Sequence, residues 1–76
     1  MDFDIDRAAE LVLALMQLGL HEGARTWKGY DWEVLDHLYQ QGLISNPASK
    51  AKSVVLTEDG EARSRAMFEK YLVRAA

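Results

Sequence analysis

Two runs of residues decide the fold of this chain: Gly42-Leu43-Ile44-Ser45-Asn46-Pro47, and Lys50-Ala51-Lys52-Ser53-Val54-Val55-Leu56-Thr57-Glu58-Asp59-Gly60. Their order predicts a helix end, a short strand, an exposed loop, a second strand and a helix start. Gly42 suits the left-handed residue that closes a helix, so that Leu43 can pack back on Leu38. Thr57 supplies an N-cap hydroxyl ahead of two first-turn carboxylates. We therefore expect a β-hairpin wing between two helices.

The first helix is predicted to start near Asp4 or Asp6, to run to about Glu22 and to be closed by Gly23. On a helical projection it is polar along one narrow stripe and apolar around the rest of its circumference. Such a helix needs cover from two sides, so we expect a homodimer; the alternative is enclosure by the chain's own elements. The candidate interface consists of apolar residues from the first and last helices: Leu11, Leu15, Leu18, Ala62, Ala66 and Val73.

The segment 24–30 is too short for a helix and too aromatic for a solvated linker, so it is predicted to be a packed connector. Asp31 then caps a second helix over 32–41, and the last helix runs over 58–73. The core face of the second helix is expected to carry Trp32, Leu35, Leu38 and Tyr39. The aromatic side chains around Lys28 are predicted to plug the core, and the alternative is a cation–π ligand cage. These aromatic residues are Trp27, Tyr30 and Trp32.

The helix ending at Gly42-Leu43-Ile44, the polar wing and Val55-Leu56-Thr57-Glu58-Asp59-Gly60 resemble the C-terminal half of winged-helix regulators. Those regulators have a short helix where this chain has its connector, so a complete helix-turn-helix is absent. In finer detail, Thr26-Trp27-Lys28-Gly29-Tyr30-Asp31-Trp32, Gly42-Leu43-Ile44-Ser45, Pro47 and Lys52-Ser53-Val54-Val55-Leu56-Thr57 are similar to a small bacterial family of unknown function. That likeness spans nearly the whole chain.

The resemblance implies an intracellular bacterial protein and brings no activity, substrate or catalytic residue. The expected fold is a single α+β domain over 1–76 that is mainly helical and winged-helix-like. Its order is helix, aromatic connector, helix, two-stranded wing and helix. The acidic N-terminus lacks the basic start of a secretory signal, and the apolar run after it is too short to span a bilayer. A cytoplasmic location is therefore expected.

The charge of the chain helps to distinguish a protein-interaction module from a DNA-binding regulator. The chain has 76 residues, with nine Lys and Arg against twelve Asp and Glu and a net charge of -3. If the chain bound DNA, its second helix would take the place of the recognition helix. It would then present Asp31, Glu33 and Asp36 to the phosphates, which disfavours nucleic-acid binding. The alternative of a DNA-binding regulator would rely on a few basic side chains. These are Lys50, Lys52, Arg25 and Lys28.

No group of residues in the sequence predicts catalysis. The chain lacks cysteine, and His21 and His37 have no partner at metal-ligand spacing. No serine has the setting of a nucleophile elbow, and no Gly-rich phosphate loop is present. We therefore expect a non-enzymatic protein-interaction module without a metal or cofactor. A basic stripe on the last helix is either solvated or meets an acidic protein partner; its members are Arg63, Lys70 and Arg74.

Overall fold

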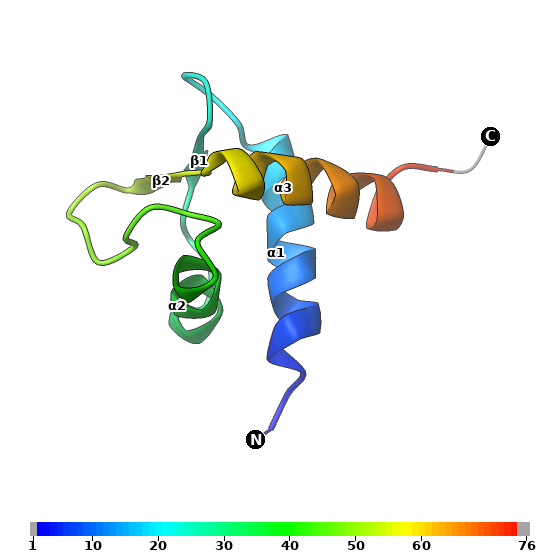
Figure 1. The fold of residues 1–76 in the computed structure, drawn as a ribbon, viewed down its shortest axis with the longest axis horizontal. Coiled ribbons are helices and arrows are strands. Elements are labelled where there is room, and N and C mark those ends of the chain that lie inside the picture. The colour runs from blue at the N-terminus through cyan, green and yellow to red at the C-terminus, as the bar shows by residue number, and fades with distance from the viewer. Residues whose placement is uncertain (1, 75–76) are drawn as a thin grey trace.

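The computed structural model describes residues 2–74 and shows an α+β fold (Figure 1). The helices in this range are α1 (Ile5–Leu18), α2 (Trp32–Gln40) and α3 (Glu58–Tyr71). Strands β1 (Arg25–Trp27) and β2 (Ser53–Val55) form a two-stranded antiparallel sheet. Helix α1 packs against both other helices, and α3 crosses it and projects beyond it (Figure 1). The predicted α+β class is confirmed, and the arrangement is consistent with a winged-helix-like fold.

Helix α1 starts as predicted and ends early. The Asp4 side chain caps it by accepting the Arg7 N–H at 3.0 Å. The helix stops at Leu18, four residues before the predicted end. Gly23 is left-handed, with φ of 82°, but Glu22 before it is left-handed too, with φ of 47°. Two such residues reverse the chain in a turn, so Gly23 does not close the helix.

Strand β1 lies inside the segment that the sequence predicted as a packed connector. It pairs with β2 in the register Arg25–Val55, Thr26–Val54 and Trp27–Ser53. The middle pair faces the core, and the Thr26 hydroxyl donates to the Met16 carbonyl oxygen at 3.0 Å. The same oxygen accepts the Gly19 N–H at 3.1 Å, so Thr26 adds a second donor at the end of α1 and ties β1 to that helix.

The predicted wing contributes less pairing than expected. Ile44 and Leu56 form a single antiparallel bridge, and the Ser45 N–H donates to the Val55 carbonyl oxygen at 2.8 Å. The main partner of the second wing strand is β1, which the sequence did not predict. The turn near Pro47 is present, because the 46–48 segment closes through the Asn46 side chain, which accepts the Ala48 N–H.

The predicted end of α2 is confirmed. Gly42 is left-handed, with φ of 75°, the Leu43 N–H donates to the Leu38 carbonyl oxygen at 3.0 Å, and the Gly42 N–H donates to that of Tyr39 at 2.9 Å. These two bonds define a Schellman ending. The start of α3 is bonded to this end of α2. The Thr57 hydroxyl accepts the Gly60 N–H at 3.0 Å as the N-cap of α3, and it donates to the Gly42 carbonyl oxygen at 2.7 Å.

One apolar core joins α1, α2 and β2, and Met67 of α3 packs against it. Its most enclosed large side chains come from α1, α2, β2 and the segment before the loop: Leu13, Met16, Leu38, Ile44 and Val54. The predicted burial of two α2 residues is wrong, because Trp32 and Tyr39 are exposed. Val34 packs into the core beside Leu35 instead. Helix α3 ends at Tyr71, two residues before the predicted end.

Candidate functional site

The outer face of α1 carries an exposed apolar row. Leu11, Leu15 and Leu18 follow one another at i, i+4 and i+7, so they lie on one side of the helix. They are 42%, 43% and 68% exposed. We call these three residues the leucine row. The core-facing residues of the same helix include Leu13 and Met16, which are almost fully enclosed.

The α3 residues of the candidate interface are not joined to the leucine row. Ser64 points at α1, because its hydroxyl donates to the Leu13 carbonyl oxygen at 2.7 Å. Ala62 and Ala66, two residues to either side, therefore project from the opposite side of α3. They are exposed, and Val73 lies beyond the helix end and is exposed as well. The structure places the six predicted residues on separate surfaces.

The predicted aromatic plug is wrong for both tryptophans. Trp27 is 56% exposed and Trp32 is 58% exposed. Trp27 projects from the outer face of the sheet, opposite the buried Thr26, and its indole lies against the backbone of Gly29. Tyr30 alone packs against the core, and burial raises the pKa of its hydroxyl. Small and aliphatic side chains fill the space that the aromatics were predicted to occupy.

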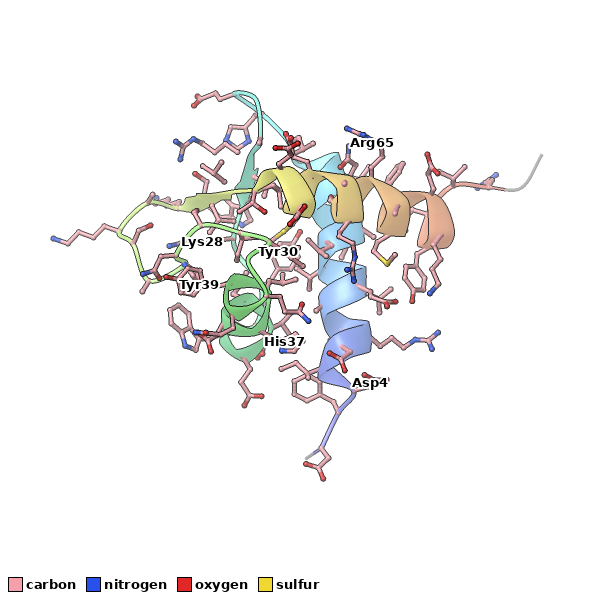
Figure 2. All side chains as sticks on the ribbon, viewed as in Figure 1. Asp4, Lys28, Tyr30, His37, Tyr39 and Arg65 are labelled. Carbon is pink, nitrogen blue, oxygen red and sulfur yellow. The ribbon has the colours of Figure 1, made fainter. Side chains whose placement is uncertain are left out.

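Two of the four basic candidates for nucleic-acid contact are held within the protein. The Lys28 ammonium donates to the carbonyl oxygens of Pro47 and Ser49, each at 2.7 Å, so it ties the wing loop to the connector (Figure 2). Arg25 donates to the Ser53 hydroxyl at 3.1 Å and lies 3.7 Å from a Glu22 carboxylate oxygen. Lys28 therefore has a structural role that the sequence did not predict.

The other two basic candidates, Lys50 and Lys52, are exposed in the wing loop. The second helix presents carboxylates to solvent, because Glu33 and Asp36 are exposed, and Asp31 is used as the N-cap, accepting the Val34 N–H at 3.2 Å. The exposed basic candidates are therefore two lysines of the wing loop, and exposed carboxylates lie on α2.

A polar network joins α1 to α3. The Tyr71 hydroxyl donates to a Glu10 carboxylate oxygen, and the Lys70 ammonium lies 3.5 Å from the same oxygen and 5.0 Å from the Tyr71 ring centroid. The hydrogen bond from Tyr71, followed by the charges of Lys70 and Arg7, lowers the pKa of Glu10. Lys70, predicted to belong to a basic stripe, is therefore partly neutralised within the chain.

The two histidines have structural partners. The His37 Nε2 lies 2.9 Å from an Asp6 carboxylate oxygen, between α2 and α1 (Figure 2), and the His21 Nδ1 lies 3.0 Å from the Gly19 carbonyl oxygen. Over residues 2–74 no three His, Asp or Glu side chains gather as a metal site. Within the same range, no helix has the length and apolar character to cross a membrane.

Residues 4–74 match a family model described as a domain of unknown function (DUF6429). The chain is 43% identical over 74 residues to "Uncharacterized protein y4hR" of Sinorhizobium fredii (strain NBRC 101917 / NGR234). That alignment covers 97% of this chain and 100% of the relative. No solved structure matches the chain. The chain therefore belongs to the DUF6429 family, which confirms its resemblance to a small bacterial family of unknown function.

Proposed function

We propose that this domain is a non-enzymatic interaction module that forms a homodimer through the outer face of α1. The observation that carries the proposal is the leucine row. The three leucines have the 4-and-3 spacing of a coiled-coil seam, which buries its side chains against a second helix. Monomeric proteins rarely leave such a continuous apolar row in water.

The total surface supports the same proposal. The chain exposes 5214 Å², whereas a compact monomer of its 8.6 kDa mass is expected to expose about 4,700 Å². The molecule is thin, with extents of 41 × 36 × 19 Å. A domain of this shape has little depth in which to bury an apolar helix on all sides. A second copy laid on α1 would supply the missing cover.

An antiparallel pairing of the two α1 helices fits the charges. A parallel pair would bring together two acidic N-terminal ends, each bearing Asp4 and Asp6. In an antiparallel pair centred midway between Leu11 and Leu15, Leu11 of one chain lies opposite Leu15 of the other. Arg7 then lies beside the C-terminal turn of the partner's α1, whose last turn has no basic residue of its own.

The first test is the mass in solution. Light scattering at low micromolar concentration should report twice the chain mass. Joint replacement of Leu15 and Leu18 by serine should raise the dimer Kd roughly a thousandfold, since each change occurs twice and costs about 1 kcal/mol or more. Val55→Ser removes an exposed apolar side chain from the sheet and should leave the mass unchanged. A monomer at high concentration would refute the proposal.

Cysteine cross-linking tests the orientation, and the chain has no cysteine of its own. A mixture of Leu11→Cys and Leu15→Cys should form disulfide heterodimers in the antiparallel arrangement. Each variant alone should cross-link far more slowly, because identical positions lie too far apart along the axes. Fast cross-linking of either variant alone would indicate parallel helices instead. No cross-linking in any mixture would contradict pairing through α1.

DNA binding is the alternative function, and it would depend on Lys50 and Lys52. We expect no mobility shift with random duplex DNA at about 0.15 M salt, because the α2 carboxylates oppose phosphate approach. If binding did occur, joint replacement of the two lysines would remove about two units from the log–log salt slope. Salt-dependent binding that this double change abolishes would favour a DNA-binding regulator over the interaction module.

A further inference from the structure

The outer face of α2 is a second surface with apolar side chains that residues 2–74 leave exposed. Trp32, Asp36 and Tyr39 follow one another at i, i+4 and i+7 and so form one row. The aromatic members are 58% and 38% exposed, whereas Val34 and Leu35 of the same helix are enclosed in the core. Aromatic side chains contribute much of the energy of protein interfaces, and their rings are costly to leave in water.

This face is negatively charged. Glu33 and Asp36 are exposed, and among residues 2–74 neither forms an ion pair with a basic side chain. The sequence contains no Lys or Arg between Lys28 and Lys50. The Lys28 ammonium is held by two carbonyl oxygens of the wing loop. Among residues 2–74 no basic side chain pairs with these carboxylates, so the face is open to a cation from another molecule.

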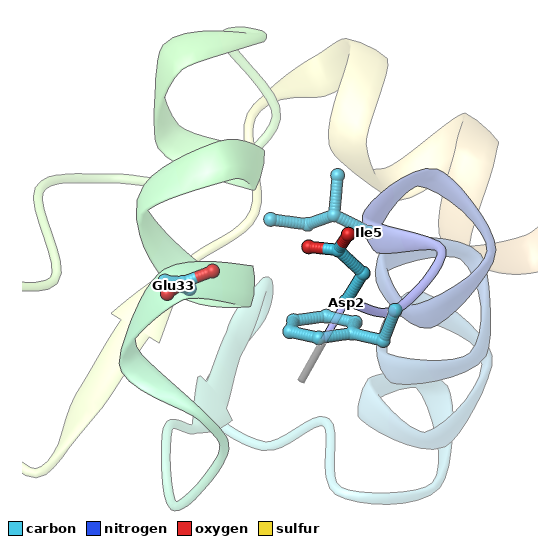
Figure 3. A pocket seen from close by; sticks show the side chains of 4 residues that line it. Asp2, Ile5 and Glu33 are labelled. Atoms are coloured by element: carbon cyan, nitrogen blue, oxygen red, sulfur yellow. The ribbon is translucent and has the colours of Figure 1, made fainter.

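A cleft opens beside Glu33, between α2 and the start of α1 (Figure 3). It has a volume of about 250 Å³, and its lining combines the carboxylates of Asp2 and Glu33 with the apolar side chains of Phe3 and Ile5. Figure 3 shows Asp2 and Ile5 projecting toward α2. A lysine or arginine side chain matches this lining, because its apolar stem can lie on Phe3 and Ile5 while its charged end reaches the carboxylates.

We infer that the outer face of α2 docks a basic segment of a protein partner. One arginine or lysine side chain occupies the cleft between Asp2 and Glu33, and a second cation lies over the Trp32 ring beside Asp36. Cations bind the face of an indole favourably, and arginine also stacks on it. The two features together, carboxylates and exposed rings, fit an arginine-containing peptide better than a small polyamine, which has no planar guanidinium group to stack on Trp32.

The probe is a capped peptide of alternating arginine and alanine, with spermidine as the competing small cation. Because Trp27 also fluoresces, the titration uses the Trp27→Phe protein, in which the Trp32 emission reports binding. We expect saturable binding of the peptide. Joint Glu33→Gln and Asp36→Asn replacement should weaken it at least about fivefold, as should Trp32→Ala measured by calorimetry.

The matched control is Asp59→Asn with Glu69→Gln, which makes the same change in net charge on α3. This control should bind the peptide as the parent does. Equal weakening by both double variants would mean that only net charge matters, and it would overturn the proposal. Spermidine binding as tight as that of the peptide, or no saturable binding of the peptide, would overturn it too. The Leu15→Ser and Leu18→Ser protein should still bind, which separates this surface from the dimer.

Discussion

Replacing Gly60 by alanine should destabilise this domain, although the same change inside an ordinary helix is stabilising. Gly60 lies buried in the first turn of α3, and a Cβ there would lie 1.9 Å from the carbonyl oxygen of Leu43. Ordinary contact begins at 3.4 Å, so the two segments must separate by about 1.5 Å to remove the overlap. The obstacle is a backbone atom, so no side-chain rotation relieves the clash.

Two effects of opposite sign set the magnitude. Alanine favours a helix interior over glycine by about 1 kcal/mol. Overpacking of a tight site costs about 1–3 kcal/mol, and more where the backbone must move. The Leu43 carbonyl also accepts the Thr57 N–H at 3.0 Å, so separation weakens the start of α3 as well. We expect a net loss of about 2 kcal/mol, which lowers Tm by about 8–16 °C in a domain of this size.

Thermal unfolding followed by circular dichroism, at one protein concentration, measures this loss. Gly42→Ala is the matched control, because Gly42 has φ of +75° and a Cβ added there would meet no atom within 4 Å. That variant should lose only about 1 kcal/mol, from left-handed backbone strain. A Tm of Gly60→Ala equal to or above that of the parent would refute the close approach of α3 to Leu43.

Three more substitutions test other features. Lys28→Met should lower stability by about 1–2 kcal/mol and speed proteolytic cleavage in the 46–52 loop, because two carbonyl oxygens lose their charged donor; unchanged cleavage would contradict this role. Trp27→Ala should lower the free energy of unfolding by only about 1 kcal/mol, against about 3–5 kcal/mol for a buried indole. A large decrease in Tm would instead indicate that Trp27 plugs the core. The pKa of Glu10 is lowered in the fold. Ionised Glu10 therefore stabilises the folded state fully above its ordinary pKa of 4.5, and this stabilisation is lost as pH falls through the lowered pKa. Tyr71→Phe should therefore lower Tm more at pH 7 than at pH 3, and an equal loss at both would argue against the network.

Features that depend on local backbone chemistry were predictable from the sequence. Gly42 closes α2, and Thr57 starts α3, because a left-handed residue and an N-cap hydroxyl each act within a few residues. The same holds for Asp31, whose side chain caps α2. Such signals need no knowledge of the distant parts of the chain.

Features that depend on distant partners were not predictable. Strand β1 has only three residues, and its partner β2 lies more than twenty residues later in the sequence. Gly23 is left-handed, as expected, but the sequence did not show that Glu22 would be left-handed too. The apolar circumference of α1 indicated an uncovered face, but only the direction of Ser64 toward α1 showed that Ala62 and Ala66 lie elsewhere.

The exposure of the aromatic side chains follows from how closely the elements approach one another. Gly60 meets the Leu43 carbonyl, the Ser64 hydroxyl meets the backbone of α1, and Thr26 meets the end of that helix. Small residues at these three contacts leave a shallow core, and close packing leaves no room there for an indole. The core is complete without Trp27 and Trp32, so changes to their rings should have little effect on folding. Loss of partner binding in a Trp32 variant can therefore be assigned to the α2 surface itself once its unchanged Tm has been measured.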